Sequence, residues 1–369
     1  MKMRDAKKYG LSDFQWASVL ICTILGAGIT TLPRTIAETA GRDGWISILI
    51  AGAATWAMAA FVWLLCRKFP TKTLPEFSVL ILGRPLGALV SVMYAIYAIG
   101  ISGVALRIFT ELATTWTLIW TPQPVFLLAN LVPVVYISRM GAVTLGRLME
   151  LVVYMTGTVI FVYLVPLAEF DILNLRPVGA EGLPAILSAI PDASFAFLGF
   201  EVLLVFFPFI INRDRVLRIT LLALTVITVL YAGNVFLTFG VLGVEHTLLQ
   251  TWPLMNYLRV GTLPFIQRVD NLVLFIWTAQ VIGLVAIQYY AGTFTLATLT
   301  RHHYHDIWAL VAWPVVYAVA IIPERLSEVF ELGDQIGRWG LFGILGLTGL
   351  LLLVAKIRGL DESKEEKID

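Results

Sequence analysis

The stretch LGAGITTLPR, residues 25–34, decides the fold because it interrupts an apolar segment, 12–40, that is long enough to cross a bilayer. Glycine lets the backbone leave helical geometry, and proline is tolerated in the first turn of a helix but not in its interior. The chain is therefore expected to break near Gly26 and Gly28 and to resume as a second half-helix at Pro33. Within a membrane, such a break occurs only where protein or a water-filled cavity takes up the freed backbone groups. The stretch thus predicts a ligand site.

A second break is expected in the segment 184–209, where Pro191 and the run Gly199-Phe200-Glu201 interrupt another apolar stretch. Gly199 takes the place of Gly28 when the two halves of the chain are aligned. Interrupted helices in corresponding positions of two halves indicate the binding site of a secondary transporter. The paired breaks are therefore the strongest indication in the sequence of where a binding site lies.

The composition predicts that the rest of the chain is membrane helix as well. Of the 369 residues, 59% are hydrophobic and 14% are charged, with a mean hydropathy of +0.85, whereas soluble domains carry about 25% charged residues. A helix needs about 20 apolar residues to cross the bilayer core, which predicts an all-α integral membrane protein with about ten transmembrane helices. The expected helices are 12–40, 44–65, 86–120, 125–137 and 148–168, followed by 184–209, 216–242, 265–300, 307–322 and 337–355.

Two groups of five helices have the parity of a 5+5 inverted repeat. The repeats span about 12–168 and 184–355, the tail 356–369 is polar and cytoplasmic, and the chain 1–369 forms a single transmembrane domain. Most of the 26 Lys and Arg residues fall in the N-terminus, the tail and alternate loops, and such an excess marks the cytoplasmic side. Both termini are therefore expected inside, with the loops 244–264 and 324–335 outside.

The first break offers the chemistry to bind a carboxylate. The start of a half-helix presents free N–H groups to an anion, and threonine hydroxyls lie beside it. An amino-acid carboxylate is the natural ligand. The alternative is that small residues here simply allow close helix packing. The expected binding residues of this stretch are Gly26, Ala27, Gly28, Ile29, Thr30 and Thr31.

Glu201 lies near the middle of the second interrupted segment, too far from either interface for its carboxyl group to reach water. An ionisable group at that depth is costly and usually functional. It is expected to carry a proton or to meet a ligand ammonium; the alternative is a structural carboxylate that is hydrogen-bonded across the bundle. The candidate binding set is completed by Phe197, Gly199, Phe200 and Tyr97.

Other polar residues within the helices are expected to have structural roles. Arg107 and Glu111 have the spacing of a local ion pair, and snorkelling of Arg107 to the interface is favoured over chemistry. Arg34 and Glu38 have the same spacing, and a plain surface pair is favoured over a gate lock. The remaining residues are expected to be buried thiols (Cys22, Cys66), satisfied phenols (Tyr94, Tyr289, Tyr290) and a histidine run too short for a metal site (His302, His303, His305).

No metal, cofactor or nucleic-acid partner is indicated, and the chain carries no motif for hydrolysis, redox chemistry or phosphoryl transfer, so an enzyme is not expected. The partners that the composition and the breaks do indicate are the lipid bilayer and a small ligand that resembles an amino acid.

Motifs that are typical of a known family occur along nearly the whole chain. They are Gly26 to Ile29, Leu32 to Arg34, Gly44-Trp45, Phe69 to Leu74, Glu76, Leu82-Gly83, Leu86-Gly87, Phe197 to Glu201, Phe207 to Phe209, Trp252-Pro253, Arg259, Phe265-Ile266, Arg268, Asp270 and Trp277. Through these residues the sequence resembles the amino acid, polyamine and organocation (APC) transporter superfamily, and within it the B subunits of bacterial spore germinant receptors. The outer stretch from Gln267 to Asp270 departs from the Glu-rich pattern expected there.

The resemblance implies a LeuT-like fold with broken helices 1 and 6 that binds an amino acid or a similar germinant at the midplane, in the inner membrane of the spore. It also implies partner A-type and C-type subunits and a signal for germination as the output. Because a fold does not fix a function, a proton-coupled amino-acid permease and an ion or water channel on the same scaffold remain alternatives.

Overall fold

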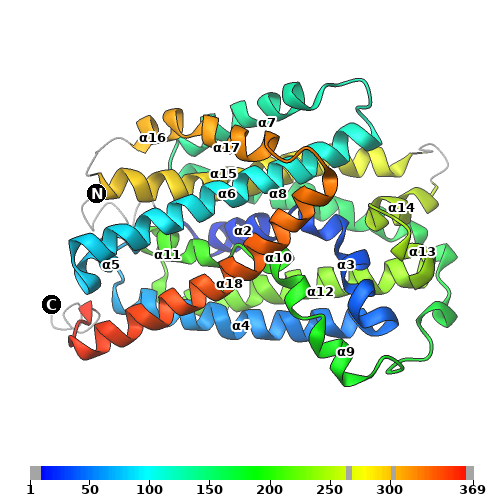
Figure 1. Cartoon of the computed structure of the whole chain (residues 1–369), viewed down its shortest axis with the longest axis horizontal. Coiled ribbons are helices and arrows are strands. Elements are labelled where there is room, and N and C mark those ends of the chain that lie inside the picture. The colour runs from blue at the N-terminus through cyan, green and yellow to red at the C-terminus, as the bar shows by residue number, and fades with distance from the viewer. Residues whose placement is uncertain (1–9, 263–267, 301–304, 363–369) are drawn as a thin grey trace.

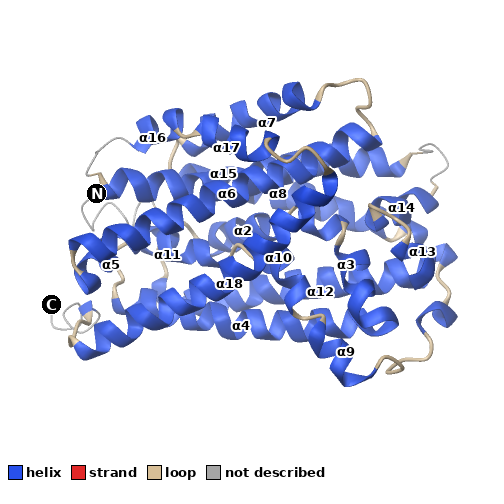
Figure 2. Cartoon of the chain, in the orientation of Figure 1, coloured by secondary structure: helices blue, strands red, loops and turns tan. Residues whose placement is uncertain are grey.

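In the computed structural model, residues 10–262, 268–300 and 305–362 are described, and every named element within them is a helix (Figure 2). Six helical spans are long and apolar enough to cross a membrane, and a bent pair, 182–197 with 200–209, forms a seventh. Three of the six spans are single helices: Arg84–Trp116 (α6), Val269–Leu299 (α15) and Leu326–Ile357 (α18). The span Leu32–Lys68 contains α3 (Leu32–Ala40) and α4 (Gly44–Lys68). The spans Ala142–Glu169 and Arg213–Leu242 contain α8 (Ala142–Tyr163) and α12 (Val216–Leu242), respectively.

Three shorter apolar helices accompany these spans: α2 (Asp13–Ile24), α7 (Gln123–Ser138) and the pair α16 (His305–Val311) and α17 (Trp313–Ile321). The expected all-helical membrane fold is confirmed, and the chain is a multi-pass membrane protein. The total of ten crossings stays a prediction because the three shorter helices fall below the length of a full span. The remaining helices are α5 (Leu74–Leu82), α9 (Gly182–Ser188), α10 (Ser194–Phe197), α11 (Leu203–Phe206), α13 (Val244–Leu248) and α14 (Pro253–Val260).

The centre of the bundle is formed by α6 and α15, which pack along each other and are the most deeply buried of the long spans. The two broken segments lie beside this pair, and α4, α12 and α18 pack around them (Figure 1). Both central helices contribute small residues at the contact: a Cβ added to Gly292 of α15 would meet Ile99 of α6 at 2.9 Å. The breaks are therefore enclosed by protein, which satisfies the requirement for irregular backbone within a membrane.

One end of the bundle is tied together by segments that the charge pattern assigns to the cytoplasm. Asp13 at the start of α2 pairs with Arg215 before α12 at 3.4 Å, and Lys72 pairs with Glu362 of the C-terminal segment at 2.6 Å. Figure 1 shows α5 and the last turns of α18 at this end, with α9, α13 and α14 at the other. The segments that are expected in the cytoplasm thus lie at one end of the bundle. That this end faces the cytoplasm remains a prediction from charge.

The opposite end carries a second set of links. Arg42 pairs with Glu245 at 2.7 Å and donates to the carbonyl of Arg176, while Asp43 accepts from the backbone N–H of Gly179 and of Glu181. The Arg42 guanidinium, through its hydrogen bond, lowers the pKa of the Glu245 carboxyl below its usual range. These contacts join the turn between α3 and α4 to the segment before α9 and to α13.

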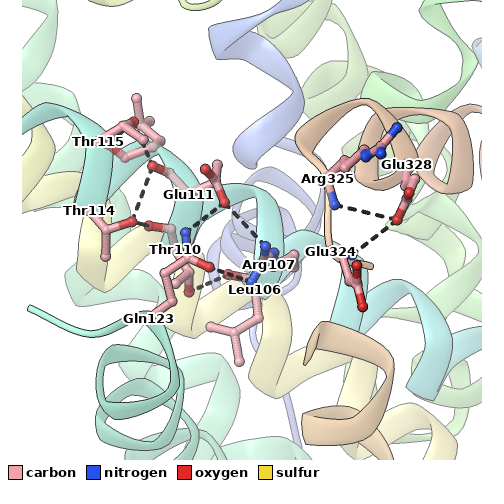
Figure 3. Close-up of polar contacts among 11 residues, drawn as sticks. Leu106, Arg107, Thr110, Glu111, Thr114, Thr115, Gln123, Glu324, Arg325 and Glu328 are labelled. Atoms are coloured by element: carbon pink, nitrogen blue, oxygen red, sulfur yellow. Dashed lines mark hydrogen bonds and ion pairs between the residues drawn. The ribbon is translucent and has the colours of Figure 1, made fainter. Parts of the chain in front are cut away.

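The helix boundaries differ from expectation mainly where polar residues continue a helix. The region 324–335 was expected to be an outer loop, but α18 already begins at Leu326. Glu328 caps this start, because its carboxyl group accepts from the N–H groups of Glu324 and Arg325 (Figure 3). Similarly, α8 begins at Ala142, six residues before the expected start at Leu148. In both places the helix begins earlier than expected, because polar residues form its first turns.

Arg107 forms the expected ion pair with Glu111, at 3.3 Å, and Gln123 at the start of α7 bridges the two side chains (Figure 3). The expected snorkelling is wrong, however, since only 6% of the Arg107 side chain is exposed. The pair therefore ties α6 to α7 inside the protein. Arg34 and Glu38 do form a plain surface pair, with 39% and 53% of their side chains exposed.

Candidate functional site

The first broken segment consists of α2, a single turn of tight helix over Ala27–Thr30, and α3. Gly26 is extended where the chain leaves α2, and a Cβ there would lie 2.2 Å from Leu284 Cδ1 of α15. At Gly28, a Cβ would lie 3.3 Å from Ala196 Cα in the second broken segment. Both glycines therefore permit close approach of neighbouring elements, and the break falls where the sequence predicts it.

Side chains from distant helices bind the carbonyl groups that this break frees. Gln280 of α15 donates to the carbonyls of Cys22 and Leu25 at 3.2 and 2.8 Å. From α12, Tyr231 donates to the carbonyl of Ile24 at 2.6 Å, and Asn234 donates to the carbonyl of Ile29 at 2.8 Å. These three donors were not anticipated, because a sequence does not show which polar residue of a later helix faces a given carbonyl.

The second broken segment bends by 51° between Phe197 and Phe200. Gly199 stands at the bend with a φ of +129°, a region that side chains rarely adopt. A Cβ at Gly199 would also lie 2.8 Å from Ile24 Cγ1 and 2.9 Å from Thr23 Cγ2. Conformation and space both require glycine here, and the two breaks are in contact with each other.

Glu201 is fully buried just after this bend, and its carboxyl group is bound by three donors. Oε1 accepts from the Tyr97 hydroxyl of α6 at 2.9 Å and from Gln288 Nε2 of α15 at 3.0 Å. Oε2 accepts from the backbone N–H of Gly199 at 2.7 Å. Glu201 thus joins α6, α15 and the second break. These contacts are those of a structural carboxylate, and they are equally compatible with a functional role for the carboxyl group.

A small cavity of about 20 Å³ lies between the two breaks and the central helices. That volume holds about one water molecule, so a larger ligand requires the two broken segments to move apart. Most of the lining residues are apolar, and Thr23 and Gln288 are the two polar ones. The lining residues are Thr23, Ile24, Ala27, Ile101, Ala105, Phe195, Leu198, Leu284 and Gln288.

Gln288 supplies an unused acceptor beside this cavity. It is 1% exposed, its Nε2 is held by Glu201, and its Oε1 is buried without a hydrogen-bond partner among the described residues. A buried polar atom left without a partner is costly and calls for an explanation. A donor group on a ligand in the cavity would provide one.

The expected binding residues divide between the cavity and its surroundings. Ala27 lines the cavity, whereas Ile29 lines a separate apolar pocket of about 180 Å³ next to α8 and α12. The Thr30 and Thr31 hydroxyls donate to the carbonyls of Ala27 and Gly28. Phe197 and Phe200 are buried, and Phe197 packs edge-on against the Tyr231 ring at 5.3 Å. Tyr97 lies behind the cavity, connected through Glu201.

The other polar residues singled out in the sequence have structural contacts. Cys22 and Cys66 are buried free thiols, as expected. Tyr94 donates to the carbonyl of Glu201 at 3.4 Å, and Tyr289 donates to that of Ala309 at 2.5 Å. Tyr290 packs against the rings of Phe206, Phe294 and His305. His302, His303, Arg301, Phe265, Ile266 and Gln267 lie outside the described residues.

Two interrupted helices that meet around a small cavity, inside a bundle of long apolar helices, define a class of fold that is known from broken-helix transporters. Comparison with solved structures shows the same fold. The fold is similar to that of MhsT in complex with L-phenylalanine (TM-score 0.65, 11% identity, 93% of this chain and 88% of that one). It is also similar to Mhp1, a nucleobase-cation-symport-1 family transporter (TM-score 0.58, 13% identity, 93% and 77%).

Within this class the chain belongs to the spore germination protein family, since the family model described as "Spore germination protein" matches residues 10–329. It is 28% identical to spore germination protein YndE of Bacillus subtilis (strain 168) over 94% of this chain and 97% of the relative. It is 26% identical to spore germination protein A2 of the same organism, over 89% and 90%. The protein is therefore a germination-related membrane protein on a transporter-like scaffold.

Proposed function

We propose that this chain is the membrane-embedded, ligand-sensing subunit of a spore germinant receptor. The ligand is an amino acid or a similar small nutrient, bound between the two breaks, and the output is a signal for germination. Membership of the spore germination protein family supports the biological role. The single observation that carries the ligand site is the buried, unpartnered Oε1 of Gln288 beside the cavity.

The ammonium group of the ligand would donate to Gln288 Oε1. Glu201 supports this by accepting from Gln288 Nε2, which turns the amide oxygen away from the carboxyl group and leaves it free to accept. Glu201 then acts as a positioning residue, because its hydrogen bond fixes the orientation of the Gln288 amide. In this role Glu201 neither carries a proton nor contacts the ligand; it is a structural carboxylate whose hydrogen bond positions the acceptor for the ligand.

The carboxylate of the ligand would bind on the side of the first break. The N–H groups at the start of the half-helix that resumes toward Pro33 have no partners within that helix and lie at its positive end. Ala27 of this turn lines the cavity, and Thr30 and Thr31 lie in the same turn. The small apolar wall of Ala105, Ile101 and Leu284 favours a ligand with a short, uncharged side chain.

Sensing would follow from the size of the cavity. Since about 20 Å³ accommodates no amino acid, the ligand binds only a conformation in which the broken segments have separated. Ligand binding then shifts the population toward that conformation. Signalling would occur with A-type and C-type receptor subunits in the inner membrane of the spore, with both termini of this chain in the cytoplasm.

A screen of the proteinogenic amino acids by thermal shift on the purified protein tests the proposal, because a ligand selective for the folded state raises its Tm. In Gln288→Met, which keeps the size but removes both the acceptor and the donor to Glu201, we expect Kd to rise at least roughly 10- to 150-fold, since a hydrogen bond to a charged group contributes about 1.5–3 kcal/mol. The deaminated analogue of the ligand should bind wild type and variant equally weakly.

The alternatives give different results in proteoliposomes. Uphill accumulation of the ligand by this chain alone would identify a permease, and a ligand-gated conductance of the chain alone would identify a channel. The absence of any amino-acid-induced rise in Tm, for the chain alone and together with its A-type and C-type partners, would contradict the proposed ligand site.

A further inference from the structure

The end of α2 presents a set of carbonyl groups that requires a positive partner. The last carbonyls of a helix have no acceptor role within it, and together they form the negative end of its dipole. In transporters with discontinuous helices, the carbonyls of such a half-helix end coordinate the coupling cation. In this chain the corresponding carbonyls belong to Cys22, Ile24 and Leu25, next to the break at Gly26.

A neutral amide lies on these carbonyls. Gln280 is fully buried in α15, and its Nε2 bridges the oxygens of Cys22 and Leu25, at 3.2 and 2.8 Å. The carbonyl of Ile24, between them in sequence, accepts from the Tyr231 hydroxyl at 2.6 Å. The carbonyls of Cys22, Ile24 and Leu25 are therefore bound by side-chain donors that belong to the protein.

The remaining contacts of Gln280 fix the orientation of its amide group. Its Oε1 accepts from the Thr156 hydroxyl of α8 at 3.0 Å and lies 3.6 Å from the Cys22 thiol, a weak donor. An amide turned the other way would direct its oxygen at two carbonyls and its N–H groups at two donors. The network thus assigns the nitrogen to the carbonyls, and every hydrogen-bonding position of the side chain is used.

We propose that the Gln280 amide is a built-in replacement for a coupling cation, so that the folded state of this protein does not depend on Na⁺ or a similar monovalent cation. The amide nitrogen bridges the oxygens that such a cation would coordinate, and its two N–H groups carry the partial positive charge that the helix end requires. This inference concerns the scaffold and goes beyond the proposed function, because it holds whichever ligand occupies the cavity.

The test compares Tm of the purified full chain in NaCl and in choline chloride at equal ionic strength. Wild type should melt at the same temperature in both salts. In Gln280→Glu, a carboxylate faces two carbonyl oxygens, and in Gln280→Ala those oxygens are left free. Both variants should be less stable in choline chloride and should regain stability in NaCl, with a Tm that rises with the logarithm of the Na⁺ concentration, as expected for a ligand of the folded state.

Thr156→Val is the matched control. It removes one hydrogen bond from the other side of the same amide but leaves Nε2 on the carbonyls, so its Tm should fall equally in the two salts. A wild-type Tm that rises specifically with Na⁺ would overturn the inference. Variants at Gln280 that show no difference between the salts would also overturn it, as would failure of both to fold even in NaCl, because a bound cation should replace the lost donor.

Discussion

The Tyr97 hydroxyl and the Glu201 carboxyl group are joined by a 2.9 Å hydrogen bond across the centre of the bundle. Tyr97 belongs to the continuous helix α6, whereas Glu201 follows the bend of the second broken segment. The bond therefore couples a rigid helix to a segment that has to move when the cavity opens. Since Glu201 also accepts a hydrogen bond from Gln288, a substitution of Tyr97 or Glu201 should change the affinity for the ligand.

Replacement of Glu201 by Gln should weaken ligand binding while the protein remains folded. The carboxyl group accepts from donors on both oxygens, and an amide in either orientation directs an N–H group at one of them. The Gln288 amide is then no longer held in its orientation, and loss of its hydrogen bond to the charged ligand, which contributes about 1.5–3 kcal/mol, corresponds to a roughly 10- to 150-fold rise in Kd by calorimetry. Tyr97→Phe removes a single donor and should have a smaller effect. An unchanged Kd in Glu201→Gln would remove this residue from the site.

Replacement of Gly28 by Val should abolish ligand binding and leave a folded, membrane-inserted protein. A Cβ at this position lies 3.3 Å from the Ala196 backbone, and the branched side chain adds two methyl groups that force the broken segments apart and block the turn at Ala27. Gly100→Val in α6, where a Cβ meets nothing within 4 Å, is the control and should bind normally. Normal binding by Gly28→Val would exclude the first break from the ligand site.

These positions illustrate what the sequence could predict. Gly28, Gly199 and Glu201 were identified because glycine and a deep carboxylate are conspicuous within apolar helices, and the expected helix 216–242 coincides with α12. Gln280 and Gln288, which both lie in α15, were not predicted. The sequence does not show how deep an uncharged amide lies in the membrane or which way it points. Their importance depends on which carbonyl or carboxyl group they face, and that is a property of the tertiary structure.

Removal of Asp192 should weaken the contacts between helices at the end of the bundle that carries α9 and α13. Asp192 accepts from the Thr39 hydroxyl of α3 at 2.7 Å and pairs with Arg338 of α18 at 2.8 Å, so it links both broken segments to a third helix. An exposed pair contributes about 0.2–1 kcal/mol, so Asp192→Ala should raise the open population by up to about fivefold. A cysteine at Ala105 in the cavity wall should then react faster with a thiol reagent, in a background without Cys22 and Cys66.

Arg34→Ala is the control for that experiment. Its ion pair with Glu38 lies within α3 and links no other helix, so the rate of thiol modification should not change. If both variants accelerated the reaction equally, general loss of outer charge would explain the effect and the role of Asp192 as a link would be rejected.

The orientation of the chain is tested by single cysteines at exposed positions. With both termini in the cytoplasm, cysteines at Arg139 and Arg215 should be labelled by an impermeant reagent only from the cytoplasmic side. Cysteines at Glu181 and Glu245, which the outer links place at the opposite end, should be labelled only from outside. Labelling of both sets from one side would disprove the alternating arrangement of the helices.

The donors at the first break have a consequence for biosynthesis. Tyr231, Asn234 and Gln280 lie more than 200 residues after the carbonyls that they bind. A ribosome delivers the first broken segment to the membrane long before it has translated these residues, and each unpaired carbonyl costs several kcal/mol in lipid. The N-terminal half of the nascent chain therefore stays incompletely folded until the second half has been inserted. A prematurely terminated chain would expose this half to quality-control proteases. The segment that is synthesised first is among the last to be completed.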